Sequence, residues 1–456
     1  MSLFDQDRRQ CLDKLIWATK KLQIDIEETQ LNKIAELIVQ TMTGPWRYFH
    51  TPEHIFEVGG DNNPIEVLSA LFHDVVYVQV DQSVNFNLSY YIIPFVKEHR
   101  GQLTIRSLEE LPDDPIFNLV LTVFGFSPAQ GLSPFGGQNE FLSAVVAAKV
   151  FEEFLPLKLI LQIVVCIEAT IPFRPKTKDG KTASEILYER GKLANEKFNV
   201  GLTEDELVVV IQSSVEMANR DVGSFANPSA AKFLDGTWSL LPETNHNLHN
   251  PASYTFSEYR IALQKMEGFM NFLKPEVIFQ QFHSIPEDEG YTSLLNRADR
   301  NLKIGRLYLG CKLLSIGFLE ALSLRLGRDI PISSMMGELP TQGFASDKLE
   351  DFIPTIEGGY ETANNDIEKE VLNLLEFGRS KNSNYDLKNS PLTTYMVKLI
   401  GFDKMREQND QLKAFFDKKI TGEEFLQKFN SEITRAVTDG LIKLFDCRKA
   451  SLTFVK

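Results

Sequence analysis

Apolar residues recur along most of the chain at the three- and four-residue spacing of amphipathic helices. One such stripe lies between residues 12 and 42, at Leu15, Ile16, Leu22, Ile34, Leu37 and Ile38. It predicts one or two helices that end before Gly44-Pro45. No stretch alternates apolar and polar residues over a length that would predict a sheet, so we expect an all-α fold.

Later segments carry the same helical pattern. The segment 64–78 is apolar on most faces and rich in good helix formers, which predicts a buried helix. Further helices are expected in the following segments: 139–154, 157–170, 182–198, 204–217, 256–273 and, beyond 305, the rest of the chain except 337–343 and 378–390. The segment 78–137 differs, because prolines recur in it and its last part has the composition of a loop.

Length and composition limit the class of protein. A chain of 456 residues is too long for one ordinary core, so two or three domains are expected. A hydrophobic content of 43% and a charged content of 24% are typical of globular proteins. The net charge of −14 argues against general nucleic-acid binding, which needs clustered Lys and Arg. An anionic substrate would then depend on a bound cation for a positive field.

The cysteines and the N-terminus favour a cytoplasmic protein. The four cysteines are far apart and form no C-x-x-C pair, so we expect neither a zinc knuckle nor a disulfide framework. The first residues do not resemble a secretory signal. The most apolar run, 155–167, is interrupted by Pro156, Lys158 and Gln162 and is too short to span a bilayer, so no membrane association is expected.

Three of the seven histidines cluster in one short window. They are His50, His54 and His73, and Asp74 directly follows the last of them. Imidazole and carboxylate groups are ligands of divalent transition metals. Residues four apart on a helix share a face, so His50 and His54 can point toward one site. Pro52 between them places the pair at the start of a helix.

His73 and Asp74 lie in an apolar context in which they are costly without compensation. They interrupt a run that is expected to be buried, where an unpaired polar or charged side chain is destabilising. A bound metal ion would compensate both side chains. The alternative is a buried, hydrogen-bonded pair of His73 and Asp74 without a metal.

These residues resemble a known family. Arg47-Tyr-Phe-His50-x-x-x-His54, followed by an apolar helix that ends in His73-Asp74-x-Val-Tyr77, is similar to the HD superfamily of metal-dependent phosphohydrolases. The branch most similar to it consists of small bacterial proteins described as predicted metal-dependent HD phosphohydrolases. The spacing of the leading histidines is also that of cyclic-nucleotide phosphodiesterases. The resemblance implies a helical bundle that carries a metal site.

A second motif of that branch extends the resemblance. The branch usually has an Asn-Glu-x-x-Ser-Ala helix soon after the His-Asp element, and here Asn139-Glu140-Phe-Leu-Ser-Ala stands much later. The segment 78–137 is therefore interpreted as an insertion. Asn85 or Asn87 gives a competing match, which lacks a following Glu-x-x-Ser-Ala.

The resemblance continues toward residue 305. Within the segment 215–225, Asp221 matches the last metal-binding aspartate of the family. A family helix that ends in a Thr near a further histidine is similar to 163–170, but no histidine follows here. Its role is either absent or taken by Glu168 or Arg174. We expect residues 1–305 to form one HD-type domain and residues 306–456 an additional helical region.

The resemblance implies that His54, His73, Asp74 and Asp221 coordinate one divalent ion. A mixed imidazole and carboxylate shell suits Mn²⁺, Fe²⁺, Co²⁺, Ni²⁺ or Zn²⁺ better than Mg²⁺. The ion would activate a bound water and polarise a phosphoryl oxygen, and Asp74 could bridge to a second ion.

Two further residues are assigned to the chemistry. His50 lies one turn before His54 but outside the ligand set, and is the expected general acid for the leaving alkoxide. Arg47 could contact a phosphate oxygen, or instead form a salt bridge to Glu53 or Glu57.

Three other polar residues have two interpretations each. Glu168 lies in an apolar helix, where it could serve the site or pair with Arg174 or Arg220. Asn139 and Glu140 could lie at the site or simply begin a helix, where Asn caps and Glu complements the helix dipole.

The leading functional hypothesis is a metal-dependent phosphohydrolase or phosphodiesterase acting on a small phosphorylated metabolite or nucleotide. The alternative is a sensor or scaffold that keeps the fold and the metal without turnover, which the missing histidine, the insertion and the C-terminal region favour. A third hypothesis, a metal-dependent oxygenase, needs extra histidines that this chain lacks.

The remaining histidines stand in polar contexts, and of these His246 and His249 could also bind a metal. An oligomer is compatible with the sequence.

Overall fold

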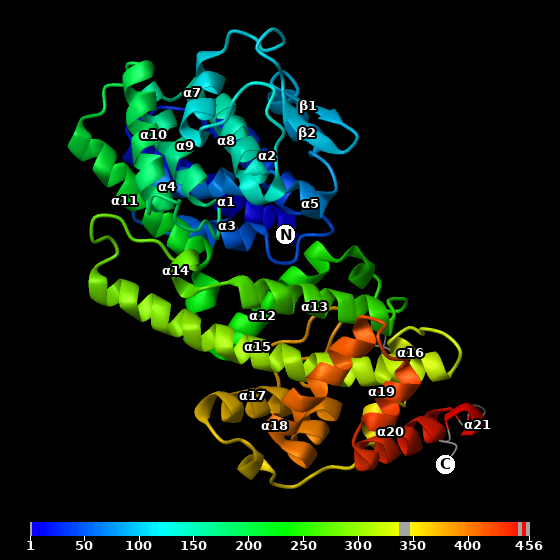
Figure 1. The fold of residues 1–456 in the computed structure, drawn as a ribbon. Helices are drawn as coiled ribbons and strands as arrows, with labels where there is room; N and C mark the ends of the chain where they lie inside the picture. The colour runs from blue at the N-terminus through cyan, green and yellow to red at the C-terminus, as the bar shows by residue number, and fades with distance from the viewer. Residues whose placement is uncertain (1, 337–346, 446–448, 453–456) are drawn as a thin grey trace. The chain divides into compact units, whose positions relative to one another are not determined.

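The computed structural model describes residues 2–336, 347–445 and 449–452, and within them helices dominate (Figure 1). The sheet found there is a two-stranded antiparallel hairpin of β1 (Val96–His99) and β2 (Gln102–Ile105). The expected all-α fold is therefore confirmed. The chain forms two compact units. Unit 1 contains Met1–Phe225 and Lys274–Asn296, and unit 2 contains Ala226–Leu273 and Arg297–Lys456.

Unit 1 holds the hairpin and the N-terminal helices. Its helices are α1 (Leu3–Lys21), α2 (Glu28–Met42), α3 (Pro52–Gly59), α4 (Pro64–His73), α5 (Val78–Asp81), α6 (Phe86–Ile92), α7 (Pro115–Phe124), η1 (Pro134–Gly136), α8 (Gln138–Phe151), α9 (Leu157–Ala169), α10 (Ala183–Lys197), α11 (Glu204–Asp221) and α14 (Pro275–Ile278), with η2 (Gly223–Ala226) at its boundary. The predicted helices between 139 and 217 are thus present with small shifts at their ends.

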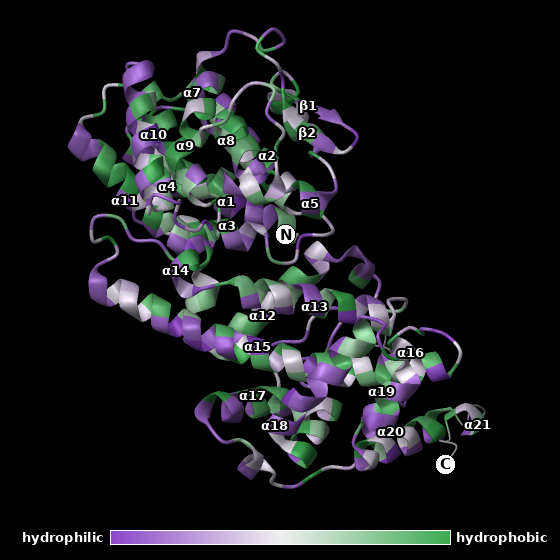
Figure 2. Cartoon of the chain, in the orientation of Figure 1, coloured by the Kyte–Doolittle hydropathy of each residue, from purple (hydrophilic) through white to green (hydrophobic). Residues whose placement is uncertain are grey.

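The core of unit 1 forms around three apolar helices. α4 packs against α8 and α9, and α9 also packs against α11. Figure 2 shows α8 and α9 as hydrophobic over most of their length, and most of their residues are buried. Phe72 at the end of α4 meets Phe151 of α8 edge to face, with ring centroids 5.2 Å apart. These contacts fix the C-terminal end of α4, which carries His73.

The segment 78–137 contains more regular structure than its composition predicts. It includes α5, α6, the hairpin and α7, where the sequence indicated loop chemistry. α7 begins with Asp114, whose side chain caps the helix, and Pro115 at the first helical position. Its residues Phe117, Val120 and Phe124 are buried in the core of unit 1. Part of this segment is therefore packed in the core of unit 1.

Unit 2 starts earlier in the chain than expected. Its helices are α12 (Ala230–Thr244), η3 (His246–His249), α13 (Phe256–Phe272), α15 (Asp288–Arg325, from residue 297 onward), α16 (Ser333–Met336), η4 (Leu349–Phe352), η5 (Tyr360–Thr362), α17 (Asp366–Phe377), α18 (Pro391–Phe416), α19 (Gly422–Lys428), α20 (Ser431–Leu444) and α21 (Lys449–Leu452). We expected the first domain to extend to residue 305. In the structure Ala226–Leu273 instead belongs to unit 2. The predicted break at 378–390 separates α17 from α18, and the break at 337–343 lies outside the described residues.

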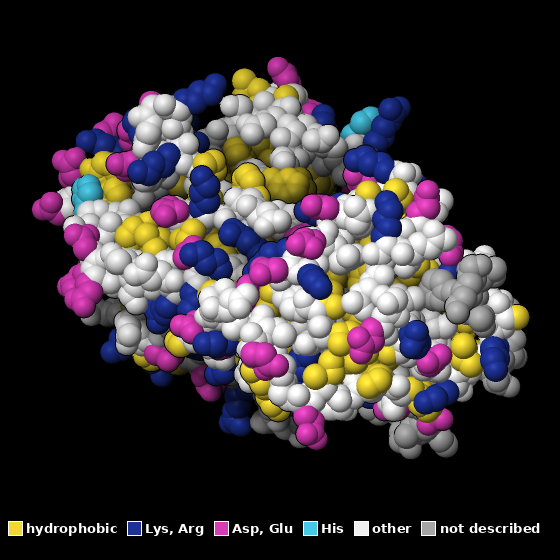
Figure 3. Space-filling view, turned by 60° about the horizontal axis from the view of Figure 1, so that its bottom comes forward, with side chains coloured by type: hydrophobic (Ala, Val, Ile, Leu, Met, Phe, Trp, Pro, Cys, Tyr) yellow, Lys and Arg dark blue, Asp and Glu magenta, His cyan; other side chains and the backbone are white. Residues whose placement is uncertain are grey.

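Among the described residues one helix, α15, is long and apolar enough to cross a membrane by length and composition. However, 89% of its apolar window is buried inside the protein, as is typical of a core helix. On the face drawn in Figure 3, Lys and Arg side chains are interleaved with Asp and Glu, so that face has no continuous basic surface.

Candidate metal centre

The four candidate ligands all stand near helix ends. Thr51 is the N-cap of α3 and Pro52 its first residue, so His54 lies in the first turn. α4 ends at His73, and Asp74 is its C-cap with φ −115°. The single helix expected over 64–78 therefore stops at residue 73, which frees the Asp74 side chain from helical geometry. Asp221 is the last residue of α11.

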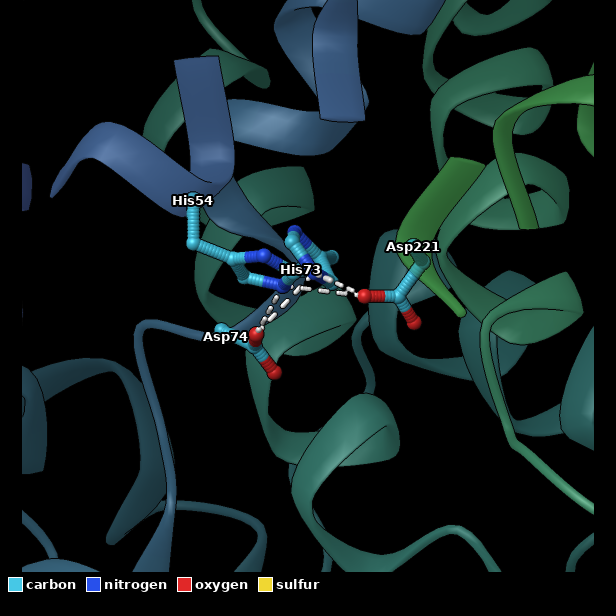
Figure 4. Close-up of side chains that lie close together, drawn as sticks. All are labelled: His54, His73, Asp74 and Asp221. Carbon is cyan, nitrogen blue, oxygen red and sulfur yellow. Dashed lines mark hydrogen bonds and ion pairs between the residues drawn. The ribbon is translucent and has the colours of Figure 1, made fainter. Parts of the chain in front are cut away.

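The side chains of these residues converge on one point (Figure 4). The His54 Nε2 atom lies 3.0 Å from Asp221 Oδ1 and 3.5 Å from Asp74 Oδ2. The His73 Nε2 atom lies 3.0 Å from Asp74 Oδ2 and 3.3 Å from Asp221 Oδ1. One ligand atom from each residue lies within 4.8 Å of all the others, which is the spread expected of ligands around a single ion.

The tautomer of His73 is fixed by a backbone carbonyl. Its Nδ1 atom lies 2.8 Å from the carbonyl oxygen of Ala70, and because that oxygen can only accept, Nδ1–H is the donor. In the neutral ring Nε2 then carries the lone pair and faces the other ligands. Orientation of a ligating imidazole by a hydrogen bond from its other nitrogen is a regular feature of metal sites.

Asp74 provides the test of whether a metal fits. Its Oδ2 atom is buried, yet it accepts no hydrogen bond from the described residues despite its closeness to His54 and His73. A buried carboxylate oxygen without a hydrogen bond is costly unless another partner compensates it. A divalent cation would do so, and two imidazoles with two carboxylates are a donor set suited to transition metals. The residues therefore fit a metal ion.

The same arrangement perturbs every titratable group in the centre. Burial alone would lower the pKa of His54, but the Asp221 and Asp74 carboxylates raise it to about 9. The pKa of His73 is also raised well above its usual value by these two carboxylates, against the effect of burial. Burial would raise the pKa of Asp221, whereas His54 and His73 lower it to about 2. Without a metal, protons take the place of the cation.

Metal binding is therefore expected to compete with protons. His54 and His73 must each lose a proton to bind, so the affinity for Mn²⁺ should rise by up to about a hundredfold per pH unit as pH approaches 9. Isothermal titration calorimetry between pH 6 and 9, in buffers of different ionisation enthalpy, measures the affinity and the released protons. An affinity that does not change with pH would contradict this assignment of the ligands.

The stability of the metal-free protein should follow the opposite trend. The raised pKa of His54 stabilises the fold fully below its ordinary value of 6.5, and this contribution is lost as pH rises through about 9. The lowered pKa of Asp221 stabilises the fold above its ordinary value of 3.8 and loses its effect as pH falls through about 2.

Arg47 holds the backbone beside the candidate ligands. It is buried, and its Nε and Nη2 atoms donate to Asp81 at 3.1 and 2.6 Å. Nη1 donates to the carbonyl oxygen of Asp74 at 2.8 Å and contacts Met42 Sδ at 3.1 Å, and Nη2 also reaches the Val75 carbonyl at 3.5 Å. These contacts use all five N–H groups, so the expected contact with a phosphate oxygen is replaced by a positioning role.

The salt-bridge partner of Arg47 also differs from expectation. It is Asp81 of α5, not Glu53 or Glu57 of α3. Spacing along the chain favoured glutamates one or two turns away, whereas the fold brings in a carboxylate from the segment that was interpreted as an insertion.

His50 lies beside the centre, outside the four ligands. Its ring centroid is 5.7 Å from that of His54 and 4.4 Å from that of Tyr77, both edge to face. Although burial would raise the pKa of Asp74, His73 and also His50 help hold it well below its usual range. His50 is therefore within electrostatic reach of the ligands, as a proton donor at this site would need to be.

The motif that begins at Asn139 supports the centre from α8. Gly137 precedes this helix with φ +88°, and a Cβ there would lie 2.4 Å from Ile171 Cδ1, so glycine is required. Asn139 Oδ1 accepts from the Val78 backbone N–H at 3.2 Å. Burial raises the pKa of Glu140 to about 8, with Asp74 and Asp221 adding to the effect. Asn139 thus ties α8 to the start of α5, and Glu140 is within electrostatic reach of Asp74 and Asp221.

Glu168 is committed to two arginines. It is fully buried in α9, and Arg174 donates to it from Nη1 at 2.7 Å and from Nη2 at 3.2 Å. Arg190 adds a contact at 3.3 Å. Of the two partners considered from the sequence, Arg174 is present and Arg220 is not. With both carboxylate oxygens engaged, Glu168 serves the structure here rather than a reacting group.

Some supporting residues have no clear signal in the sequence. Arg220 donates to the Val58 carbonyl at 2.7 Å and pairs with Glu66, which fixes the end of α11 against α3 and α4. Asn219 exchanges two hydrogen bonds of 2.8 Å with the backbone of Gln280. Such partners are far apart in sequence. The one signal that could have indicated a partner is Glu66, because a charged residue in an otherwise apolar helix needs an opposite charge.

The other candidate histidine pair does not form a comparable group. Among the described residues, three or more close His, Cys, Asp or Glu ligand atoms occur together only at His54, His73, Asp74 and Asp221. His249 Nε2 instead lies 2.8 Å from the Pro242 carbonyl oxygen, so it is the donor to that oxygen. The metal site expected from the histidine cluster is the one for which the fold provides ligands.

Comparison of the whole chain with protein-family models, with curated proteins and with solved structures finds no match in any of the three.

Proposed function

We propose that unit 1 is an HD-type metal-dependent phosphohydrolase or phosphodiesterase that acts on a small phosphorylated metabolite or nucleotide. The observation that carries the proposal is the convergence of His54, His73, Asp74 and Asp221, with Asp74 Oδ2 buried and without a hydrogen bond. The spacing of these residues in the sequence supports it independently, because it resembles that of the HD superfamily.

The four residues would hold the ion in this proposal. When bound, a divalent ion supplies a nucleophilic water and Lewis-acid polarisation of a phosphoryl oxygen. Arg47 keeps the Asp74 backbone in place through its 2.8 Å hydrogen bond, and Ala70 fixes the His73 ring. His50 donates a proton to the leaving alkoxide, a role suited to an imidazole beside the ligands but outside their set.

Replacement of His50 separates proton transfer from metal binding. His50→Ala is expected to retain stoichiometric Mn²⁺ and lower kcat by about 100- to 10,000-fold, the usual contribution of a general acid. The assay uses bis-nitrophenyl phosphate, cyclic nucleotides and nucleotides with added Mn²⁺. His99→Ala is the matched control, because His99 is exposed on β1. Unchanged kcat for His50→Ala with the same substrate would contradict the proton-donor role.

A sensor or scaffold without turnover is the second candidate. Glu168 and Arg174, which could replace the histidine missing after α9, are paired with each other, so neither is available as an obvious substitute. If the metal-loaded wild type hydrolyses none of the substrates yet binds one of them tightly, the sensor replaces the enzyme as the proposed function.

A further inference from the structure

Unit 2 contains a largely buried carboxylate, that of Asp386, with several donors around it. Asp386 lies in the segment between α17 and α18, and its Oδ2 atom accepts from Trp238 Nε1 and from the Tyr259 hydroxyl, each at 2.7 Å. Lys312 Nζ of α15 donates to the same oxygen at 3.3 Å, and an Arg379 Nη2 atom lies 3.8 Å away. Burial would raise the pKa of Asp386, but Lys312 and Arg379 hold it below its usual range.

These contacts do not use every hydrogen-bonding group of Asp386 and Lys312. All the donors converge on Oδ2, while Oδ1 of Asp386 accepts no hydrogen bond from the described residues. Lys312, with three N–H groups, donates to Asp386 and to Ser390 Oγ at 3.1 Å. A polar ligand could therefore still be recognised here.

A cavity of about 70 Å³ lies against this network. It has room for a few water molecules or one small ligand, since a single water needs about 10–15 Å³ on this scale. Polar groups of Lys312, Asp386 and Glu350 line it together with the apolar side chains of Ile316 and Leu319. Apolar walls with a few placed polar groups are typical of small-molecule sites.

Glu350 lines this cavity and forms no ion pair with the described residues. Among the described residues, the Leu392 backbone N–H donates to Glu350 Oε1 at 3.4 Å. Burial raises the pKa of Glu350, against the effects of the Leu392 N–H and of the Lys312 and Lys348 ammonium groups. Lys312 is already shared by Asp386 and Ser390. A partly buried carboxylate in this position is best stabilised by a cation with N–H donors.

We propose that this cavity binds a small organic ammonium ion, with a protonated amino group held by Glu350 and by Oδ1 of Asp386. Tyr254 and Tyr259 line the same cavity, and the Lys312 ammonium lies over the Tyr259 ring, 5.9 Å from its centroid, so a cation is already accommodated beside this ring. Ile316 and Leu319 contact a short apolar body. Anions are disfavoured, because Asp386 and Glu350 face them and the ammonium of Lys312 is already neutralised.

Ligand-detected saturation-transfer NMR on the full chain tests this inference with ethylamine and ethanolamine. Ethanol and acetate are the neutral and anionic counterparts of similar size. Concentrations of about 10 mM are needed, because ligands this small bind no tighter than the millimolar range. Addition of EDTA makes the result independent of the centre in unit 1. Saturation transfer to the amines but not to ethanol or acetate is expected.

Two substitutions locate the binding. Glu350→Gln is expected to weaken amine binding by about 10- to 100-fold, the value of a charged hydrogen bond. Ile316→Phe should remove it by filling the cavity. Glu423→Gln is the control, since Glu423 pairs with Arg325 away from the cavity. Equal transfer to amine, alcohol and acetate, or amine binding unchanged in both cavity variants, would overturn the proposal.

Discussion

Replacing His73 and Asp74 together with alanine is expected to reduce bound Mn²⁺ from about one ion per chain to background. The double substitution removes two of the four converging ligands, including the oxygen of Asp74 that is buried without a hydrogen bond. The remaining His54 and Asp221 would pair with each other across 3.0 Å, which makes a weak site for a metal. Metal content is measured by plasma mass spectrometry after reconstitution and gel filtration.

The control for this variant changes the same residue types in the same unit. His99→Ala with Asp113→Ala removes an exposed histidine and an exposed aspartate and should retain the metal. Far-UV circular dichroism of both double variants establishes that they remain helical. Stoichiometric metal in the folded His73→Ala/Asp74→Ala variant would place the metal elsewhere and remove the basis of the proposed function.

The second large effect is expected in unit 2, where Asp386→Asn should destabilise the fold by about 3–5 kcal/mol. The substitution keeps the shape of the side chain but removes the charge that Lys312 and Arg379 share. Lys312 is buried and would lose its carboxylate partner, while Trp238 and Tyr259 would donate to a weaker acceptor. Breaking one partner of a buried ionic network is costly because the other charge stays desolvated.

Denaturant unfolding followed by tryptophan fluorescence measures this loss, because Trp238 is in direct contact with Asp386. Asp403→Asn is the matched control. Asp403 is exposed and pairs with Arg406 on the surface, so a change within about 0.5 kcal/mol is expected. If the two variants unfold at the same denaturant concentration, the Asp386 network does not carry the stability assigned to it.

The helical architecture could be read from the sequence because apolar spacing is a local property. The helices expected at 157–170 and 182–198 correspond closely to α9 and α10, whose ends carry ordinary cap residues such as Thr182. Local spacing does not report which helices share a core. For this reason α7 was missed in a segment rich in prolines, and the grouping of Ala226–Leu273 with unit 2 was not anticipated.

The candidate ligands could be identified from the sequence for a different reason. His73 and Asp74 are polar residues at the end of an apolar run. Such residues are expected to be buried, and when buried they need a compensating partner whatever the rest of the fold is. The partners of Arg47 and Glu168 could not be chosen in this way, because several opposite charges stood at suitable sequence distances. Only the fold brings Asp81 to Arg47 and Arg190 to Glu168.

Anomalous diffraction from crystals soaked in Mn²⁺ tests the central claim most directly. We predict a peak enclosed by His54 Nε2, His73 Nε2, Asp74 and Asp221, with ligand distances of about 2.0–2.3 Å. A second peak bridged by Asp74 would agree with two-ion chemistry. A well-ordered centre without a peak at saturating Mn²⁺, or a peak away from these four side chains, would contradict the account.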